Sequence, residues 1–559
     1  MGCFKVLLRV AVRHRLWYDE AIDRRGGIGM KKLPIGIQTF RKIIEDNCIY
    51  VDKTKYIYDL INDFSCFFLS RPRRFGKSLL LDTIGEVFNG NKELFKGLWI
   101  YDSDYDFAKH PVIRLDMSNI ANETPETMKE SLSLQLKKRI KEEGLDITGE
   151  TPSDLFQFLI EALYKKYKQK VVVLIDEYDK PILDHILDIE KAEANRATIR
   201  GFYSILKSMD PYLRFTFITG VSKFTKTSIF SGMNNLLDIT MQEKYANICG
   251  IPVEDLDGYF HDHIAALSSR DTFQRIGNLH DEILAWYDGY SWDGKTRVIN
   301  PFGLLTFFAQ ERFANFWYSS GSPKFLMDMI KKDPEIIVNL NEYNMGEWEM
   351  DVFDVQSIEV APLLFQTGYL TVKEVLHGLG STSYLLEIPN REVRETFNLQ
   401  LMAELTERQY TVAGTAYRNM LESLQKGDLQ RVLSILKSLF AAIPYQLHIN
   451  MEAYYHSIFF AVMSVLDFKT YAEVSTSMGR IDAVLEMADK IYVLEFKYED
   501  CAPDADAETK RTLFKRALDK GAEQLLERGY ADKYQGGGKQ IIQAAFVFLG
   551  RDNIEMRVL

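Results

Sequence analysis

The chain has 559 residues, of which 46% are hydrophobic and 26% charged, a composition typical of a globular protein with about two to four domains. Its net charge of −11 argues against a protein that coats nucleic acid with its whole surface, although a local basic channel is compatible with it. The five cysteines are scattered and form no C-x-x-C pair, which predicts a reducing compartment and no zinc site.

Residues 1–29 contain an apolar run that is too short, and too often interrupted by charge, to span a membrane. We therefore expect a cytoplasmic protein with no membrane partner. Gly2 would suit a myristoylation signal, but Val6 stands where Ser or Thr is required. The sequence MKKLPIG, beginning at Met30, has the form of a natural start, so residues 1–29 are interpreted as a non-native or disordered extension.

Residues 36–55 combine a short helical pattern with a strand-like run, Cys48–Val51. Two interpretations stay open. The segment either holds the base of a bound nucleotide or is a plain structural lead-in to the strand that follows.

Residues 66–81, CFFLSRPRRFGKSLLL, have the order strand, polar loop and helix that a phosphate-binding P-loop requires. Gly76 lets the backbone approach the phosphates, Lys77 reaches their oxygens, and Ser78 supplies a hydroxyl for Mg²⁺. The usual G-x-x-x-x-G-K-[ST] pattern has glycine at the position of Arg71, so the loop must begin differently here. Helical periodicity continues over residues 79–88.

A strand is predicted over residues 111–115, and a second over the start of VVVLIDEYD, residues 171–179. Five consecutive apolar residues in the second predict a strand buried on both faces of a parallel sheet. Asp176 and Glu177 follow at its carboxyl end, where Asp176 can hold Mg²⁺ and Glu177 can polarise the attacking water. Two acids there, about a hundred residues after Gly-Lys-Ser, predict a P-loop ATPase that uses ATP and Mg²⁺.

A third buried strand, residues 215–218, ends at Thr219, our candidate for a residue that senses the γ-phosphate, with Ser222 as the alternative. The plain interpretation is a threonine that caps a strand end. No arginine finger can be selected from the sequence. The cations available are Arg73, Arg74 and Lys226, of which Arg73 and Arg74 are also candidates for contact with the nucleotide.

Residues 251–397 are helical and aromatic, with a hairpin expected near residues 370–386. We predict a helical lid followed by a winged-helix-like or linker module, and interpret the aromatic clusters at 286–290 and 300–302 as core rather than as platforms for bases. Residues 398–450 are predicted to form a helical connector with a break at Pro444.

An apolar helix is predicted over residues 451–467, with Glu452 and His456 one turn apart on the same face. A hairpin is predicted over residues 479–497. Alternation along its second strand directs Glu495 and Lys497 to one face.

Asp482 lies on the partner strand of this hairpin, so two carboxylates and an ammonium group can converge. Metal-dependent phosphodiester hydrolysis needs this set: Asp482 and Glu495 would hold Mg²⁺, and Lys497 would orient the attacking water. The alternative is a surface strand with an ordinary ion pair. Gln524 and Tyr530 are candidates for positioning the substrate or Lys497.

The sequences RPRRFGKS, LIDEYD, ITGVSKF and SGMNN resemble the AAA-ATPase-like family of bacterial proteins, in which arginine at the first P-loop position is usual. The sequences EAYYHS, GRIDAVLE and YVLEFKY are similar to the PD-(D/E)XK nuclease domain that commonly ends such proteins. The resemblance implies an α/β protein: a P-loop AAA-like domain with a parallel sheet, a helical lid and linker region, and a C-terminal restriction-endonuclease-like α/β domain. The matching site residues are Lys77, Ser78, Asp176, Glu177, Asp482, Glu495 and Lys497.

The expected domains are residues 30–250 for the ATPase, 251–397 for the lid and linker, 398–450 for the connector and 451–559 for the nuclease-like domain. The first functional hypothesis is an ATPase that gates or moves a nuclease, with nucleic acid, DNA in particular, as substrate. Its rival is a regulatory NTPase switch whose nuclease-like domain only binds nucleic acid or a protein. Hydrolysis of another phosphodiester or of a nucleotide, and assembly into a homo-oligomer, are left open.

Overall fold

The computed structural model describes residues 30–223, 229, 235–317, 326–327, 329–330, 343–350, 359–378, 381–405, 410–440, 469–476, 479–487, 489–502, 505–527, 534, 538–550 and 553–559. The chain divides into two compact units. The N-terminal unit comprises Met1–Trp317 and Asn344–Leu386, and the C-terminal unit comprises Tyr318–Tyr343 and Glu387–Leu559.

The N-terminal unit is built around a parallel five-stranded sheet of order β2-β3-β4-β1-β5. Its strands are β1 (Cys66–Ser70), β2 (Val112–Asp116), β3 (Val171–Asp176), β4 (Leu213–Gly220) and β5 (Leu237–Asp238). Every residue of β1 and β3 is buried, as expected for apolar strands with helices on both faces. The strands predicted at 66–69, 111–115, 171–176 and 215–218 are thereby confirmed.

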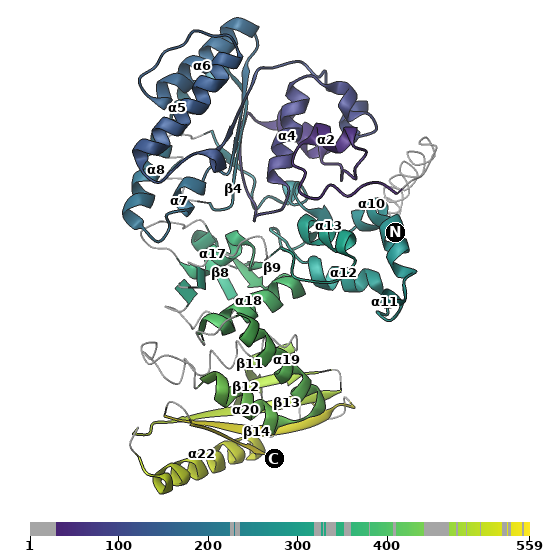
Figure 1. Cartoon of the computed structure of the whole chain (residues 1–559), viewed down its shortest axis with the longest axis vertical. Helices are drawn as coiled ribbons and strands as arrows, with labels where there is room; N and C mark the ends of the chain where they lie inside the picture. Colours follow the sequence, from purple (N-terminus) through teal and green to yellow (C-terminus); the bar gives the residue numbers. More distant parts are fainter. Residues whose placement is uncertain are drawn as a thin grey trace. The chain divides into compact units, whose positions relative to one another are not determined.

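Helices cover both faces of this sheet: in Figure 1, α5, α6 and α8 lie on one face and α2 and α4 on the other. Their bounds are α2 (Phe40–Glu45), α3 (Thr54–Asp63), α4 (Lys77–Phe88), α5 (Pro125–Glu142), α6 (Pro152–Tyr167), α7 (Lys180–Leu183), α8 (Ile189–Tyr203) and α9 (Ile205–Ser208). Short 3₁₀ turns occur at Lys92–Phe95, Trp99–Asp102, Met117–Asn119, Asp210–Tyr212 and Glu243–Tyr245. Capping boxes at Thr124 and Thr151, each followed by proline, begin α5 and α6.

The strand expected over Cys48–Val51 is wrong. Only Cys48 forms an isolated bridge, to Lys32, and the chain then turns into α3. The carboxylate of Asp52 accepts a hydrogen bond from the Thr54 amide at 2.8 Å, which ends the extended run. Cys48, Ile49 and Tyr50 are all buried, so this short apolar run fills the core without pairing in a sheet.

Beyond β5, the N-terminal unit continues as a helical layer with its own aromatic core. Its elements are β6 (Ile251–Pro252), α10 (Asp255–Ser268), α11 (Asp271–Gln274), α12 (Leu279–Tyr287), β7 (Val298–Ile299) and α13 (Pro301–Gln310). Tyr287 and Phe307 are fully buried in this core, and Tyr290 is 1% exposed. The interpretation of the 286–290 aromatic cluster as core is confirmed.

The rest of the N-terminal unit contains a small three-stranded sheet, β8-β10-β9, and two helices. The bounds are β8 (Tyr343–Gly346), α16 (Glu347–Met350), α17 (Val360–Thr367), β9 (Thr371–His377) and β10 (Thr382–Glu387). Because β9 and β10 are neighbours joined by a short connection, the hairpin predicted near 370–386 is confirmed.

The C-terminal unit combines helices α18 (Arg391–Leu405), α19 (Tyr410–Lys426) and α20 (Leu429–Phe440) with a mixed five-stranded sheet of order β11-β12-β13-β14-β15. The strands are β11 (Lys469–Thr476), β12 (Gly479–Glu486), β13 (Lys490–Glu499), β14 (Gln540–Leu549) and β15 (Asn553–Val558), and α22 (Ala507–Glu527) joins β13 to β14. The β12–β13 pair is antiparallel, which confirms the predicted hairpin, whereas β13 and β14 are parallel. Figure 1 shows α22 on one side of this sheet and α19 and α20 on the other.

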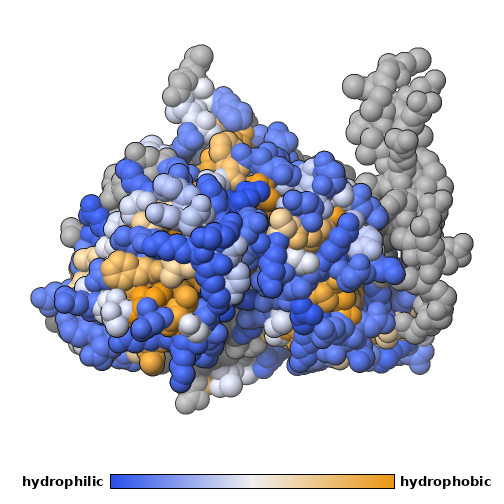
Figure 2. Space-filling model, turned by 90° about the horizontal axis from the view of Figure 1, so that it is seen from above, coloured by the Kyte–Doolittle hydropathy of each residue, from blue (hydrophilic) through white to orange (hydrophobic). Residues whose placement is uncertain are grey.

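Figure 2 shows a mainly hydrophilic face on which hydrophobic residues gather in separate patches. Exposed large apolar side chains of the N-terminal unit include Phe64, Leu134, Phe158, Leu187 and Ile189. In the part of the chain that the structure describes, no helix is both long and apolar enough to cross a membrane.

Candidate functional site

The predicted P-loop connects β1 to α4. Gly76 has φ +92° and stands at the N-terminus of α4, where backbone amides point away from the helix. Among the described residues, no atom would lie within 4 Å of a Cβ added at this position, so there is open space beside Gly76. The left-handed backbone and this open space make a cradle suited to an anion.

Lys77 is the first residue of α4 and is 6% exposed. Its Nζ donates to the carbonyl oxygens of Arg71 at 2.8 Å and Pro72 at 3.0 Å. Burial lowers the pKa of this ammonium group, and the charge of Asp176 acts in the opposite direction. The amino group thus lies inside the curve of the loop, with acids nearby that favour its charged form.

The strand order places Thr219 beside Asp176. Strand β4 lies between β1 and β3, so its carboxyl end stands between the P-loop and the two acids. The Oγ1 of Thr219 donates to Oδ1 of Asp176 at 2.7 Å, and both side chains are buried. The fold therefore joins two residues that were predicted separately, at the edge where α/β sheets bind ligands.

Glu177 follows β3 in a left-handed conformation with φ +49°. A non-glycine residue there is held by its surroundings, and such residues are concentrated at functional sites. Burial raises the pKa of the Glu177 carboxyl, while the positive charge of Lys77 works against that rise. Glu177 is thus electrostatically linked to the lysine of the loop.

Two further acids at this edge were not selected from the sequence as site residues. Asp116 ends β2 in register with Asp176, and its carboxylate accepts hydrogen bonds from Ser118 and Asn119. Asp179 is buried and accepts hydrogen bonds from the amides of residues 221 and 222. Asp179 could have been found from the sequence, because it is the last acid of the run Asp-Glu-Tyr-Asp that follows the apolar strand.

Ser222, the alternative sensor, is fully buried, and its amide is bound to Asp179 at 2.6 Å. Of the two candidates, Thr219 is the one whose side chain bonds to Asp176. Gly220 is required here, because a Cβ would lie 2.5 Å from the ring of Tyr178 and 2.6 Å from the Asp179 carboxylate.

Arg73 and Arg74 are exposed on the P-loop. The carbonyl oxygen of Arg73 accepts a hydrogen bond from Trp317 Nε1 at 3.1 Å, and the Arg74 guanidinium lies 4.9 Å from the ring centre of Phe302. The third candidate finger, Lys226, lies outside the described residues.

The segment 36–55, which precedes β1, contacts the part of the chain that follows β5. Lys53 is 8% exposed, and its Nζ donates to the Asn247 carbonyl oxygen at 2.7 Å. Burial lowers the pKa of Lys53 to about 8.

The residues at this edge fit a magnesium nucleotide. An open cradle at a helix N-terminus suits phosphate, and the carboxylate of Asp176 and the hydroxyl of Ser78 are hard oxygen donors of the kind that Mg²⁺ prefers.

The predicted nuclease residues lie on β12 and β13. Glu495 is fully buried, and its Oε1 is 2.6 Å from the Nζ of Lys497, whose side chain is 20% exposed. The antiparallel register pairs Ala483 with Leu494, and Asp482 and Glu495 are the next residues beyond that pair on their two strands. The side chain of Asp482 lies outside the described residues.

Helix α22 covers the sheet face that carries Glu495 and Lys497. Leu525 packs with Val493 and Ala545 on this face. At Gly521 the helix comes so close that a Cβ would lie 3.0 Å from Cβ of Ala545 and 3.7 Å from Cγ of Lys497. Gln524, one turn further along α22, is half-buried.

The remaining accessory candidates, Glu452, His456 and Tyr530, fall outside the described residues. Among the residues that the structure describes, no group of three or more His, Cys, Asp or Glu side chains could hold a metal ion. Of the two metal ligands predicted for the C-terminal unit, the structure describes the side chain of Glu495 but not that of Asp482.

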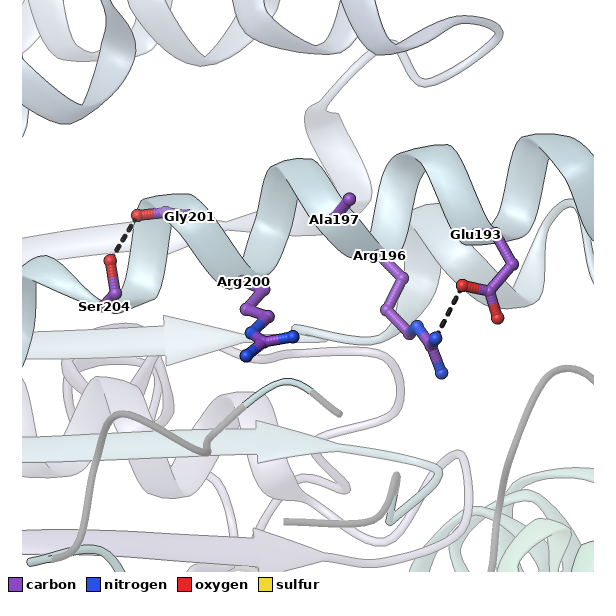
Figure 3. A pocket seen from close by; sticks show the side chains of 6 residues that line it. All are labelled: Glu193, Arg196, Ala197, Arg200, Gly201 and Ser204. Atoms are coloured by element: carbon purple, nitrogen blue, oxygen red, sulfur yellow. Dashed lines mark hydrogen bonds and ion pairs between the residues drawn. The ribbon is translucent and has the colours of Figure 1, made fainter. Parts of the chain in front are cut away.

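A separate hollow of about 330 Å³ runs along α8 and contains none of the predicted site residues. Figure 3 shows that Arg196 pairs with Glu193 and that Ser204 donates to the Gly201 carbonyl oxygen, while Arg200 extends beside them. Its lining residues all belong to one helix and the residue that follows it, and it lacks the convergent groups of the P-loop edge.

Two family models match the chain. One, described as Predicted AAA-ATPase, matches residues 34–230, and the other, the PD-(D/E)XK nuclease superfamily, matches residues 450–557. An uncharacterized protein from the vnfD 5′ region of Azotobacter chroococcum mcd 1 is 35% identical over 518 residues, covering 91% of this chain and 95% of that protein.

Among solved structures, the ORC2 protein of Aeropyrum pernix, determined in ADPNP and ADP complexes, is similar at 11% identity and a TM-score of 0.26. That match covers 62% of this chain and 93% of the archaeal chain. One family model spans the P-loop and the other the Glu495–Lys497 strand, and the Azotobacter relative aligns over nearly its whole length, so the chain belongs to the AAA-ATPase-like family, with a C-terminal domain of the PD-(D/E)XK nuclease superfamily.

Proposed function

We propose that the N-terminal unit binds and hydrolyses ATP and that the C-terminal unit is a Mg²⁺-dependent nuclease, with DNA as its substrate. The observation that carries the first half is the open cradle at Gly76, with Lys77 and the Asp176–Thr219 pair at the same edge of the sheet. The second half is carried by a buried carboxylate, Glu495, paired with Lys497 on a strand next to Asp482.

In the ATPase, the amides at the start of α4 bind the phosphates, and Lys77 exchanges its bonds to loop carbonyls for bonds to phosphate oxygens. Ser78 and Asp176 would hold Mg²⁺, which neutralises phosphate charge when the nucleotide is bound. Glu177, in its ionised form, accepts a proton from the attacking water and orients it. Thr219 fixes the Asp176 carboxylate and reports the state of the γ-phosphate.

In the nuclease, Asp482 and Glu495 would hold Mg²⁺, which polarises the scissile phosphate when bound. Lys497 holds the attacking water by hydrogen bonding and offsets the negative charge that develops on the phosphate. Burial strengthens the Glu495–Lys497 interaction, because the low dielectric beneath α22 screens charge less than water does. Gln524 would position the substrate or Lys497 from the covering helix.

The ATPase proposal is tested by Lys77→Ala and Glu177→Gln. We expect Lys77→Ala to abolish binding of a fluorescent ATP analogue, and Glu177→Gln to bind it normally but hydrolyse ATP at least about tenfold more slowly, because the two residues act at different steps. Lys137→Ala, which removes an exposed lysine from α5, is the matched control. Equal ATP affinity in wild type and Lys77→Ala would refute the ATPase assignment.

The nuclease proposal is tested with plasmid, single-stranded DNA and RNA in the presence of Mg²⁺ or EDTA. We expect cleavage of DNA by wild type to be lost in Asp482→Ala and in Lys497→Ala, with folding unchanged by circular dichroism. Lys437→Ala removes an exposed lysine from α20 in the same unit and should cleave normally. Cleavage that survives either site substitution, or proceeds in EDTA, rules the assignment out.

A further inference from the structure

Arg71 occupies the position at which the usual P-loop pattern has glycine, and its side chain is among the largest that are fully buried. Its guanidinium donates to the carbonyl oxygens of Ser70 at 2.9 Å and Thr240 at 2.8 Å, and more weakly to that of Tyr245 at 3.4 Å. These bonds satisfy the two terminal nitrogens of a buried cation, while Nε has no partner among the described residues. Burial lowers the pKa of Arg71 to about 10.

The indole of Trp292 stabilises the same guanidinium. The guanidinium carbon lies 3.9 Å from the centre of the indole ring, a cation–π contact removed from water because Trp292 is 4% exposed. Trp292 also packs edge-on against Phe75, with ring centres 5.6 Å apart. One indole therefore contacts both the first and the penultimate residue of the loop 71–76.

The backbone of residues 245–250 also binds Arg71 and Phe75 of the loop. The Tyr245 carbonyl oxygen accepts from Arg71, and the Gly250 amide donates to the Phe75 carbonyl oxygen at 3.1 Å. The Arg71 amide donates to the Gly220 carbonyl oxygen at 3.2 Å, next to Thr219. The carbonyl oxygen of Arg71 itself holds Lys77.

We propose that Arg71, held by Trp292, is a positioning residue for ATP: it replaces the conformational role of the first P-loop glycine and fixes the backbone that places Lys77 and the phosphate-binding amides. This inference rests on the proposed ATPase function. It predicts that a substitution toward the general pattern, Arg71→Gly, weakens ATP binding, because the loop then loses three side-chain hydrogen bonds and its stacking partner.

The experiment compares full-length variants by titration with a fluorescent ATP analogue in Mg²⁺, and by steady-state ATP hydrolysis. We expect affinity to fall at least about tenfold in Arg71→Gly and Arg71→Ala, with the loss falling on KM more than on kcat, and to be partly restored in Arg71→Lys. Arg200→Ala, which removes an exposed arginine from α8, is the matched control and should bind as wild type does.

A double-mutant cycle tests the pair. Trp292→Leu should weaken binding about threefold or more, Trp292→Phe should weaken it less because an aromatic face remains, and Arg71→Gly with Trp292→Leu should bind no more weakly than Arg71→Gly alone. Binding is measured well below each melting temperature. If Arg71→Gly fails to fold, Arg71→Lys and the two Trp292 variants carry the comparison.

The outcomes distinguish a failure of the positioning role of Arg71 from a failure of the ATPase function on which it rests. Wild type that binds no ATP overturns both. Wild type that binds ATP, with Arg71→Gly or both Trp292 variants binding equally well, or with fully additive losses in the cycle, overturns the positioning role and leaves the ATPase proposal standing.

Discussion

Asp176 and Glu177 are adjacent in the sequence, yet the fold gives their carboxylates different surroundings. Asp176 is 3% exposed and accepts hydrogen bonds from the Thr219 hydroxyl and from the Glu177 amide. Glu177 has left-handed backbone and a carboxyl whose pKa is raised by burial. A carboxylate that hydrogen bonds hold in place suits a cation, whereas an acid with a raised pKa suits proton transfer from water.

The raised pKa of Glu177 gives a pH prediction. Its carboxyl is protonated at pH values at which an ordinary glutamate, with a pKa of 4.5, is still ionised, so it then cannot accept a proton from water. We expect kcat for ATP hydrolysis, measured at saturating ATP, to fall as the pH is lowered, beginning above the range of an ordinary glutamate. The residual activity of Glu177→Gln should lack this fall. A wild-type profile that stays flat down to pH 4.5 would contradict the assigned role.

At the scale of elements, Gly521 decides how closely α22 covers the candidate nuclease strand. Glycine inside a helix costs up to about 1 kcal/mol relative to alanine, so a glycine there is favoured where close packing requires it. At Gly521 the atoms that a Cβ would approach belong to Ala545 and Lys497. At Gly414 in α19, the one atom of the described residues within 4 Å of such a Cβ is the Nη1 of Arg418, at 3.9 Å.

These two glycines make a matched pair for mutation. Gly414→Ala should raise the melting temperature, because alanine has the higher helix propensity and its Cβ meets no atom of the described residues closer than 3.9 Å. Gly521→Ala should fail to raise it, and should slow Mg²⁺-dependent DNA cleavage, because its Cβ displaces α22 from β14 and moves Lys497. Thermal unfolding and cleavage rates check both variants. Equal gains in melting temperature, with cleavage unchanged, would show that the close approach at Gly521 is unimportant.

At the scale of the whole molecule, two candidate active sites of different chemistry stand on one chain in separate compact units. ATP can control the proposed nuclease only if the protein has two states that differ in nuclease activity and ATP binds one of them more tightly. Allosteric coupling is this difference in binding free energy. A tethered pair without such a difference would act independently.

We expect ATP to change the rate of DNA cleavage several-fold, in either direction, which corresponds to a coupling of roughly 1 kcal/mol or more. The Glu177→Gln variant should hold the ATP-bound rate for longer than wild type, and Lys77→Ala should show no response to ATP. Cleavage rates of the full-length protein with and without ATP provide the measurement. Identical cleavage rates with and without ATP, in both wild type and Glu177→Gln, would mean that the two units share a chain but that ATP does not control the nuclease.

Several features of this protein follow from the sequence by itself. Continuous apolar runs predicted the strands at 66–69 and 171–175, and two strand-like runs on either side of a short polar turn predicted the hairpin at 479–497. Gly-Lys-Ser after a strand predicted the P-loop. Each depends on neighbours within about ten residues, so local pattern is enough to predict it. Local pattern failed at Cys48–Val51, where burial without sheet pairing produces the same apolar run.

Only the tertiary structure decided which of these elements meet. The position of β4 between β1 and β3, the bond from Thr219 to Asp176, and the cover of α22 over Glu495 all depend on contacts between segments far apart in the chain. Arg71 shows the difference most clearly. In the sequence it is a departure from the glycine pattern, and in the structure it is a buried cation held by Trp292 and by backbone carbonyls of residues 240 and 245, because a buried charge is stable only where distant parts of the chain supply its partners.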